Sequence, residues 1–392
     1  MEGIGMGSGV GGMSPFGDSA QIEVDRGLAE FRSGRPVLLR GGGETLLTLP
    51  IEGLDARRLA AFTELCARTL PRLAISARRA WALGLAAEPA ALKLAPGVSA
   101  ERILSLVADA QVSGTIEAEP LGTAGTAAIE LAKLAQGLPA ALAAPAPDTL
   151  TVDPPVAQVE AQAVGHFRRG AIRSQKIVAQ ADVLLHGGFT TRFVVFSDSV
   201  GGSSAAIIIG EPDFSRPVPV RLHSACLTGD VFSSRRCDCG DQLRLSLARL
   251  AEAGGGIVLY LAQEGRGLGL ANKMRAYQLQ DAGLDTVDAN TTLGFEDDER
   301  TYDVAARMLE LLGCRRVSLL TNNPTKVEGL AASGIEICGR MALVTPINSD
   351  NLRYLTAKAA RAGHRLHHLV EAFAQGSSVD GVPRPAKLAR SD

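Results

Sequence analysis

Apolar residues in the second half of the chain follow patterns typical of alternating strands and helices. Residues 254–261 (GGGIVLYL) form a continuous apolar run after glycines, which predicts a buried strand. Residues 270–283 place apolar side chains four and seven positions apart, on one face of a helix, and end at a glycine. These two segments therefore predict a strand followed directly by a helix.

The same alternation continues downstream. Residues 297–313 begin with acids, which favour a helix N-terminus, and continue with apolar residues on one face. Residues 316–324 predict a strand that runs into a turn, 324–334 a short helix with proline at its start, and 335–339 a final strand. The order β-α-α-β-α-β predicts an α/β fold whose sheet is at least partly parallel.

The amino-acid composition changes along the chain, and this change predicts two domains. The first region is rich in Ala and Leu, and a proline-rich stretch follows it. Specific polar clusters begin at about residue 177. We expect five segments: a disordered lead-in at 1–19, a smaller α/β (α+β) domain at 20–145, a linker at 146–176, a second domain at 177–372 and a disordered tail at 373–392.

The composition is that of a globular protein, with 46% of the 392 residues hydrophobic and 21% charged. The net charge of −2 gives no reason to expect a nucleic-acid or membrane partner. No apolar run reaches the roughly 18 residues that span a bilayer, and residues 1–19 lack the basic and apolar regions of a signal peptide. We therefore expect a cytoplasmic protein whose thiols stay reduced.

Three of the six cysteines, Cys226, Cys237 and Cys239, have the spacing C-x10-C-x-C. In a reducing compartment this spacing favours metal ligands over disulfides, and zinc binds thiolates in a tetrahedron. His223 could supply a fourth ligand, although a histidine in the core or behind the ligands is the commoner arrangement. Without it the ion would keep one position open, as catalytic zinc sites do. The other cysteines lie in apolar surroundings and are predicted to be buried: Cys66, Cys314 and Cys338.

Polar loops lie at the predicted ends of the apolar strands, where open α/β sheets bind ligands. The glycine-rich turn EGRGLGL follows a predicted strand and precedes a helix. Its N–H groups could therefore bind a phosphate, although an ordinary tight turn has the same pattern. Arg221, Arg266, Arg300 and Lys326 belong to these loops. A polyphosphate substrate fits this set, although a solvated surface charge is the commoner role of any single arginine.

Long motifs in this region carry a resemblance to a known family. They are RLHSACLTGDVFSSRRCDCGDQL, YLAQEGRGLGLANKMRAYQLQDAGLDTVDAN, LGFEDDERTYDVAARMLELLG, LLTNNPTKV and NSDNLRYLTAKAARAGH. Together they resemble GTP cyclohydrolase II of riboflavin biosynthesis over about residues 177–370. Two stretches depart from the family, ADVLLHGGFTTRF, which lacks its usual Leu-Pro-Thr turn, and ANTTLGF. Neither departure falls on an expected ligand.

The resemblance implies a GTP cyclohydrolase II-like mixed sheet with helices and a zinc-dependent reaction. GTP would be hydrolysed to 2,5-diamino-6-(5-phospho-D-ribosylamino)pyrimidin-4(3H)-one, formate and pyrophosphate. One Zn²⁺ per subunit would be bound by Cys226, Cys237 and Cys239, and Mg²⁺ would accompany the triphosphate. Asp298 would be the proton acceptor and Arg300 the nucleophile. The residues expected to bind GTP are Arg221, Leu222, His223, Ser224, Ala225, Gln242, Glu264, Gly265, Arg266, Thr286, Thr321 and Lys326.

The resemblance also assigns Tyr277 to the catalytic group, hydrogen-bonded near the reacting purine carbon. In the family a tyrosine here accompanies full deformylation, so we expect formate release rather than a formamide product. On the residues alone, Tyr277 would be a core aromatic, Asp298 a helix N-terminal acid and Arg300 an exposed charge. A homodimer is usual in the family.

The N-terminal stretch GLAEFRSGRPVLL resembles the first helix and strand of 3,4-dihydroxy-2-butanone 4-phosphate synthase. That family continues with acids that bind Mg²⁺, whereas RGGGETLLTLP has Glu44 as its only acid. We therefore expect residues 20–145 to be a degenerate relative without activity. Two alternatives stay open: a catalytically silent GTP-binding or regulatory homologue with a structural zinc, and a bifunctional enzyme with an active N-terminal domain.

Overall fold

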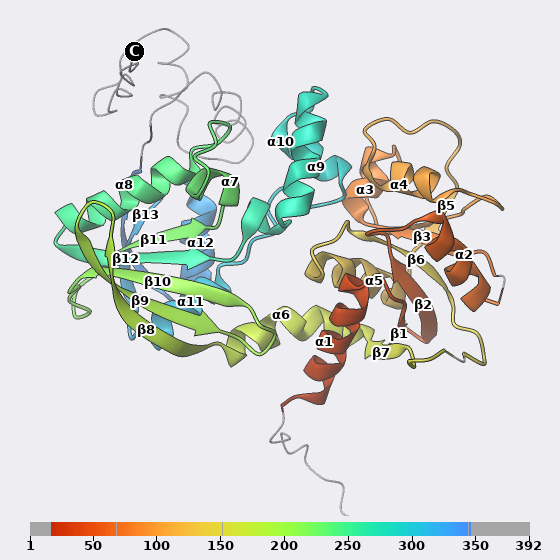
Figure 1. Cartoon of the computed structure of the whole chain (residues 1–392), viewed down its shortest axis with the longest axis horizontal. Helices are drawn as coiled ribbons and strands as arrows, with labels where there is room; N and C mark the ends of the chain where they lie inside the picture. The colour runs from red at the N-terminus through yellow and green to blue at the C-terminus, as the bar shows by residue number, and fades with distance from the viewer. Residues whose placement is uncertain (1–16, 68, 151, 344, 346–392) are drawn as a thin grey trace, which may run out of the picture. The chain divides into compact units, whose positions relative to one another are not determined.

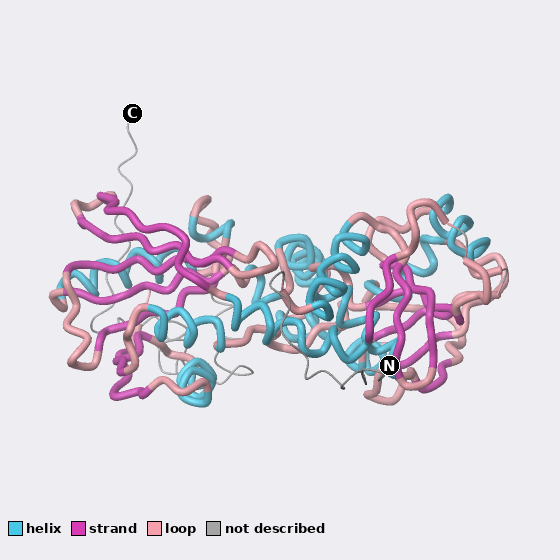
Figure 2. Tube along the Cα trace, turned by 90° about the horizontal axis from the view of Figure 1, so that it is seen from below, coloured by secondary structure: helices cyan, strands magenta, loops and turns pink. Residues whose placement is uncertain are grey.

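The computed structural model describes residues 17–67, 69–150, 152–343 and 345. The chain divides into two compact units, one formed mainly by residues up to Gly170 and the other mainly by residues from Ala171 (Figure 1). Helices lie beside strands in both units (Figure 2), as the predicted α/β class requires. The following predicted parts lie outside the described residues: most of the lead-in (1–16), the motif at 348–364 and the tail at 373–392.

The first unit is built on one sheet. Its strands are β1 (Val37–Gly41), β2 (Glu44–Pro50), β3 (Arg72–Ile75), β4 (Ala90–Leu92), β5 (Ala118–Pro120), β6 (Ala140–Pro145) and β7 (Ala157–Glu160). They are ordered β5-β4-β3-β6-β2-β1-β7. The helices are α1 (Ser19–Arg32), α2 (Ala56–Leu65), α3 (Ala77–Ala82), α4 (Ala100–Ala108), α5 (Thr123–Leu134) and α6 (Ala161–Ser174). α5 packs on β1, β2 and β6, and α1 packs on β7.

The predicted linker at 146–176 contains two regular elements, β7 and α6. β7 pairs in parallel with β1, from Val37 opposite Ala157 to Arg40 opposite Glu160. The prolines that suggest a linker end at residue 155, before β7 begins. Most of this segment therefore belongs to the first unit.

The second unit is also built on one sheet. Its strands are β8 (Lys176–Leu185), β9 (Phe189–Ser197), β10 (Ser203–Gly210), β11 (Val218–Ser224), β12 (Gly255–Leu261), β13 (Arg316–Leu320) and β14 (Glu336–Met341). The helices are α7 (Leu227–Asp230), α8 (Cys239–Glu252), α9 (Leu270–Asp281), α10 (Thr286–Thr292), α11 (Asp303–Leu311) and α12 (Pro324–Ala332), with a 3₁₀ turn η1 (Glu264–Gly267). The order is β14-β13-β11-β12-β10-β9-β8.

The second sheet is mixed, as expected. β11 runs parallel to β12 and β13, and β13 to β14, whereas β8, β9 and β10 join antiparallel. On one face Leu250 of α8 packs against Ile209 and Val258. On the other, Met308 of α11 and Leu330 of α12 belong to the larger buried cluster. Because helices cover both faces, loops at the strand ends are the natural place for a ligand.

Two predicted elements form where expected: the strand at 254–261 is β12, and the helix at 270–283 is α9. Several others need correction. The helix predicted over 297–313 begins only at Asp303, because the Asp298 carboxylate binds the Arg300 side chain instead of capping a helix. The sequence does not predict α10, whose residues TVDANTT show no apolar period. Cys338 is exposed rather than buried, because it lies on the edge strand β14.

Candidate active site

The site forms where the parallel strands β11 and β12 end side by side. Ser224 pairs with Leu261 at the last position of this ladder, and the N–H of Ala225 then donates to the Leu261 carbonyl at 2.8 Å. The two loops that follow therefore start next to each other. One carries the cysteines, and the other is the glycine-rich turn η1.

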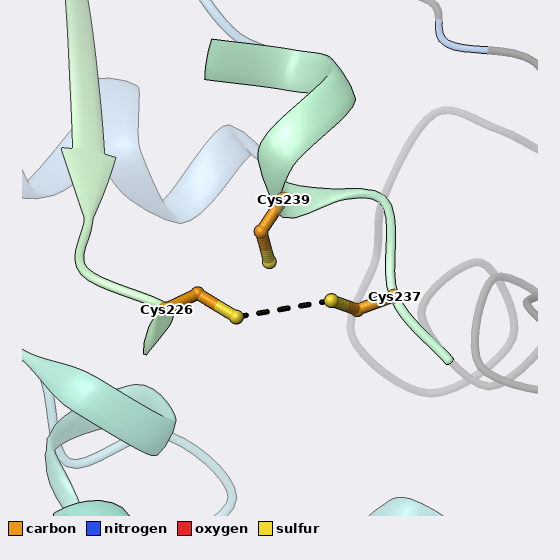
Figure 3. Close-up of side chains that lie close together, drawn as sticks. All are labelled: Cys226, Cys237 and Cys239. Atoms are coloured by element: carbon orange, nitrogen blue, oxygen red, sulfur yellow. Dashed lines mark hydrogen bonds between the residues drawn. The ribbon is translucent and has the colours of Figure 1, made fainter. Parts of the chain in front are cut away.

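The three cysteines converge from different parts of the first loop. Cys226 follows β11, Cys237 lies in the loop itself, and Cys239 is the first residue of α8; their side chains point toward one another (Figure 3). All three Sγ atoms lie within 4.8 Å of one another, and those of Cys226 and Cys237 are 3.7 Å apart. A tetrahedral zinc with Zn–S near ~2.3 Å separates its sulfurs by about 3.8 Å. The donor set therefore fits zinc in its chemistry, and the Cys226–Cys237 separation also matches this value.

Gly229 makes this convergence possible. A Cβ built on it would lie 2.9 Å from Cys237 Sγ, closer than real Cβ contacts, and 3.1 Å from Cys226 Sγ, tighter than most of them. The α7 turn can therefore lie against the sulfurs only with glycine at this position. Among the residues that the structure describes, these cysteines are the one group of three or more His, Cys, Asp or Glu side chains arranged to hold a metal.

The thiol cluster favours a thiolate at Cys226. Hydrogen bonds from Cys237 and Cys239, assisted by Lys273, lower the pKa of Cys226. The hydrogen bond with Cys226 conversely raises the pKa of Cys237 to about 11. Metal binding requires all three thiols to lose their protons. The lowered pKa of Cys226 means that this thiol loses its proton most readily.

His223 does not face the sulfurs. Its Nε2 lies 3.0 Å from Asp230 Oδ1, and burial lowers its pKa. Asp230 Oδ2 also accepts hydrogen bonds from the Cys226 N–H at 3.0 Å and the Tyr260 hydroxyl at 2.9 Å. His223 thus lies behind the cysteine loop, so the structure favours three protein ligands over four.

Asp298 and Arg300 form a tight pair in the loop before α11. The guanidinium donates from Nε to Oδ1 at 2.7 Å and from Nη2 to Oδ2 at 2.5 Å, and the Arg300 N–H donates to Oδ1 at 3.0 Å. Burial alone would raise the pKa of Asp298, but the hydrogen bonds and charge of Arg300 outweigh it and lower the pKa. The pair therefore stays ionised at neutral pH.

Tyr277 lies on α9, in the same pocket as the cysteines. The Arg236 guanidinium carbon lies 4.5 Å from the centre of its ring, a cation–π contact. Arg236 is in turn held by Asp281, with Nη2 donating to Oδ1 at 2.7 Å. The residue next to Cys237 thus contacts the Tyr277 ring on α9.

One pocket brings most of the expected site residues together. Those that line it are Ser224, Ala225, Cys226, Cys237, Cys239, Glu264, Gly265, Arg266, Tyr277, Thr286 and Arg300. Those that do not are Arg221, Leu222, His223, Gln242, Asp298, Thr321 and Lys326. Asp298 still belongs to the site through its contact with Arg300.

The other residues outside the pocket lining form a buried polar layer at the ends of β11 and β13. Arg221 donates to the Leu320 carbonyl at 3.1 Å and to the Gln242 side chain, and burial lowers its pKa to about 10. Lys326 Nζ donates to the Leu222 carbonyl at 2.7 Å. The Thr321 hydroxyl accepts from the Asn323 N–H at 3.0 Å.

The pocket also contains polar residues that the sequence analysis does not single out: Gln263, Lys273, Gln280 and Asn290. Lys273 and Gln280 lie on the helix predicted at 270–283, and a helical lysine is ordinarily a solvated charge. Their burial depends on contacts between distant segments, which local patterns do not report. Among the described residues, no helix has the length and apolar character needed to cross a membrane.

Comparisons with known proteins identify the family of the chain. The family model for GTP cyclohydrolase II matches residues 176–342. A GTP cyclohydrolase-2 from Azospirillum brasilense is 40% identical over 368 residues, which cover 89% of this chain and 95% of that protein. The riboflavin biosynthesis protein RibBA of Bacillus subtilis (strain 168) is 47% identical over 191 residues, 48% of each chain.

Among solved structures, a two-domain 3,4-dihydroxy-2-butanone 4-phosphate synthase, RibBX from A. baumannii, covers 82% of this chain and 99% of its own. Its sequence identity is 16% and its TM-score 0.31, a likeness too weak to carry an argument. The sequence relatives are enough to assign the family, because the match to the Azospirillum protein extends over nearly the whole of both chains. The chain belongs to the GTP cyclohydrolase II family of riboflavin biosynthesis enzymes.

Proposed function

We propose that the protein hydrolyses GTP to 2,5-diamino-6-(5-phospho-D-ribosylamino)pyrimidin-4(3H)-one, formate and pyrophosphate. The observation that carries this proposal is one pocket lined by the three cysteines, Tyr277 and Arg300. Cys226, Cys237 and Cys239 would hold one zinc ion per subunit. Bound zinc supplies a water activated at neutral pH, which ring opening of the purine at C8 requires.

Arg300 and Asp298 are proposed to release pyrophosphate. A guanidinium nitrogen of Arg300 forms a bond to the α-phosphorus while the bond to the bridging oxygen breaks, and pyrophosphate leaves. Water then hydrolyses the phosphorus–nitrogen bond, which frees Arg300 and releases the nucleotide as a monophosphate. A guanidinium is a poor nucleophile until it loses a proton. Asp298 would take that proton, a role supported by its ionised carboxylate, which accepts hydrogen bonds from Nε and Nη2. Mg²⁺ on the triphosphate would neutralise the leaving group.

The remaining polar residues are proposed to position the nucleotide. Glu264, Gly265 and Arg266 of the η1 turn line the pocket and are proposed to contact the nucleotide. Tyr277 is proposed to hydrogen-bond near C8 and so to favour formate release over a formamide product. The other proposed GTP contacts are Arg221, Leu222, His223, Ser224, Ala225, Gln242, Thr286, Thr321 and Lys326. We also propose a homodimer located in the cytoplasm, where thiols stay reduced.

The test is turnover of GTP by the purified full chain with Mg²⁺ and measured zinc content. Formate and pyrophosphate are quantified separately, and the pyrimidine product is identified by mass. Absence of both products from zinc-loaded protein would overturn the proposal. Release of a four-carbon product from ribulose 5-phosphate would instead support the bifunctional alternative.

Cys237→Ser separates catalytic from structural zinc. It should remove formate release while the chain stays folded and binds GTP, because an ion that serves chemistry is not needed for folding. If the site is structural, as in the silent homologue, the second unit should unfold. Cys338→Ser is the matched control, since its thiol is exposed and lies outside the cluster, and it should leave both products unchanged.

A further inference from the structure

Lys273 is a buried lysine on α9 that no part of the proposed chemistry uses. Its side chain lies in the pocket and is 10% exposed. Its ammonium makes three contacts: Glu264 Oε1 at 2.8 Å, Thr228 Oγ1 at 3.0 Å and Cys226 Sγ at 3.1 Å. An ammonium has three N–H donors, so each is matched to one acceptor.

Glu264 extends this contact to the neighbouring loop. Its Oε2 accepts the Leu227 N–H at 2.6 Å, and its Oε1 accepts the Gly265 N–H at 3.1 Å as well as Lys273. Lys273 and Glu264 therefore connect the cysteine loop after β11 with the η1 turn after β12. Hydrogen bonds between charged groups in a largely buried site are stronger than an exposed ion pair, so this connection holds the two loops together.

The fit around Lys273 is close. Gly265 has φ +60°, and a Cβ built on it would lie 3.1 Å from Lys273 Cβ. The η1 turn thus lies directly against the base of the lysine side chain. The ammonium also lies 5.9 Å from the centre of the Tyr277 ring on the same helix, so the lysine is placed between the cysteine loop, the η1 turn and this ring.

We propose that Lys273 is a positioning residue for the metal site, which holds the Cys226 sulfur in place and links it to the Glu264 turn. A divalent ion bound by three thiolates forms a complex with a net charge of −1, and the ammonium next to one sulfur offsets this charge. Donors that hydrogen-bond to metal ligands fix their orientation and tune their donor strength. The proposal rests on the proposed zinc binding by the three cysteines, and only its activity readout depends on the proposed reaction.

The decisive measurement is metal affinity of the full chain without GTP, by competition with a chromophoric chelator. Lys273→Met should weaken zinc binding by about 10- to 100-fold, the usual effect of removing such a partner. In cobalt-loaded protein the thiolate charge-transfer band should move to longer wavelength, because a sulfur without its N–H donor is the stronger electron donor. Lys93→Met is the matched control: Lys93 pairs with Glu117 and Glu119 on the surface of the first unit and should change neither readout.

Lys273→Gln keeps a hydrogen-bond donor without the charge, and it covers the case in which the methionine variant does not fold. It should weaken zinc binding as well, and formate release should fall more than pyrophosphate release. Zinc affinity within about threefold of wild type in a folded variant would overturn the proposal. So would failure of both variants to fold with saturating zinc, since the lysine would then serve the fold in general. A wild-type chain that made neither product would refute the proposed function but leave the affinity comparison decisive.

Discussion

Replacement of Asp298 by asparagine tests the pair that holds Arg300 in the pocket. Asparagine keeps one oxygen but loses the charge, and its amide N–H₂ opposes one N–H of the guanidinium. At least one of the bonds at 2.7 and 2.5 Å is therefore lost. A hydrogen bond between charged groups contributes about 1.5–3 kcal/mol, and about 1.4 kcal/mol of barrier is a factor of ten. We expect pyrophosphate release to slow by about 10- to 150-fold.

The assay follows pyrophosphate directly, with zinc content measured on the same sample. Zinc should stay at the wild-type level, because Asp298 contacts none of the cysteines. Glu310→Gln is the control, since it breaks an Arg–carboxylate pair of 3.2 Å on the surface of α11 and should cost less than about twofold. The argument is refuted if folded, zinc-loaded Asp298→Asn releases pyrophosphate within about threefold of the wild-type rate.

Two further predictions concern stability. Burial lowers the pKa of His223, so the unfolded chain binds its proton at higher pH than the folded one, and stability is lost as pH falls through the ordinary histidine range. We expect this in urea unfolding with excess zinc. Between about pH 7 and 5, the free energy of unfolding of the wild type should fall by up to about 1.4 kcal/mol per pH unit more than that of His223→Gln. Equal slopes of unfolding free energy against pH for the two proteins would contradict this. Glu44 Oε1 accepts the Ala124 N–H at 3.1 Å, at a helix whose N-cap Gly122 offers no side chain. Glu44→Ala should lower the opening free energy of α5 by about 0.5–2 kcal/mol in hydrogen exchange, and unchanged exchange would rule out this capping role.

The sequence predicts best what short-range patterns determine. The apolar run of β12 and the helical period of α9 are local, and both elements form where expected. The cysteine spacing likewise predicts a cluster, because Cys237 and Cys239 are two residues apart and one loop brings Cys226 to them. That His223 does not join the cysteine cluster follows only from the structure, where its Nε2 contacts Asp230.

The errors come from groups whose partners are distant or unexpected. Acids at 297–298 resemble a helix N-terminus, but Arg300 competes for the Asp298 carboxylate and the helix starts at Asp303. Lys273 is not singled out by any local pattern, because its acceptor Cys226 is 47 residues away in the sequence. A local pattern cannot report such a partner, because only the parallel register of β11 and β12 brings the two segments together.

The η1 turn contacts the residues around the cysteines as well as those around the Asp298–Arg300 pair. On one side Glu264 binds the Leu227 N–H and Lys273, next to the cysteines. On the other, Arg266 Nη1 donates to the Asp297 carbonyl at 3.2 Å, and its own carbonyl accepts the Glu299 N–H at 3.2 Å, beside the Asp298–Arg300 pair. Changes at Cys237 or Asp298 should therefore separate formate from pyrophosphate release, whereas changes in this turn should impair both. The η1 turn thus fixes the distance between the proposed zinc site and the proposed nucleophile Arg300. A single bound nucleotide must contact both.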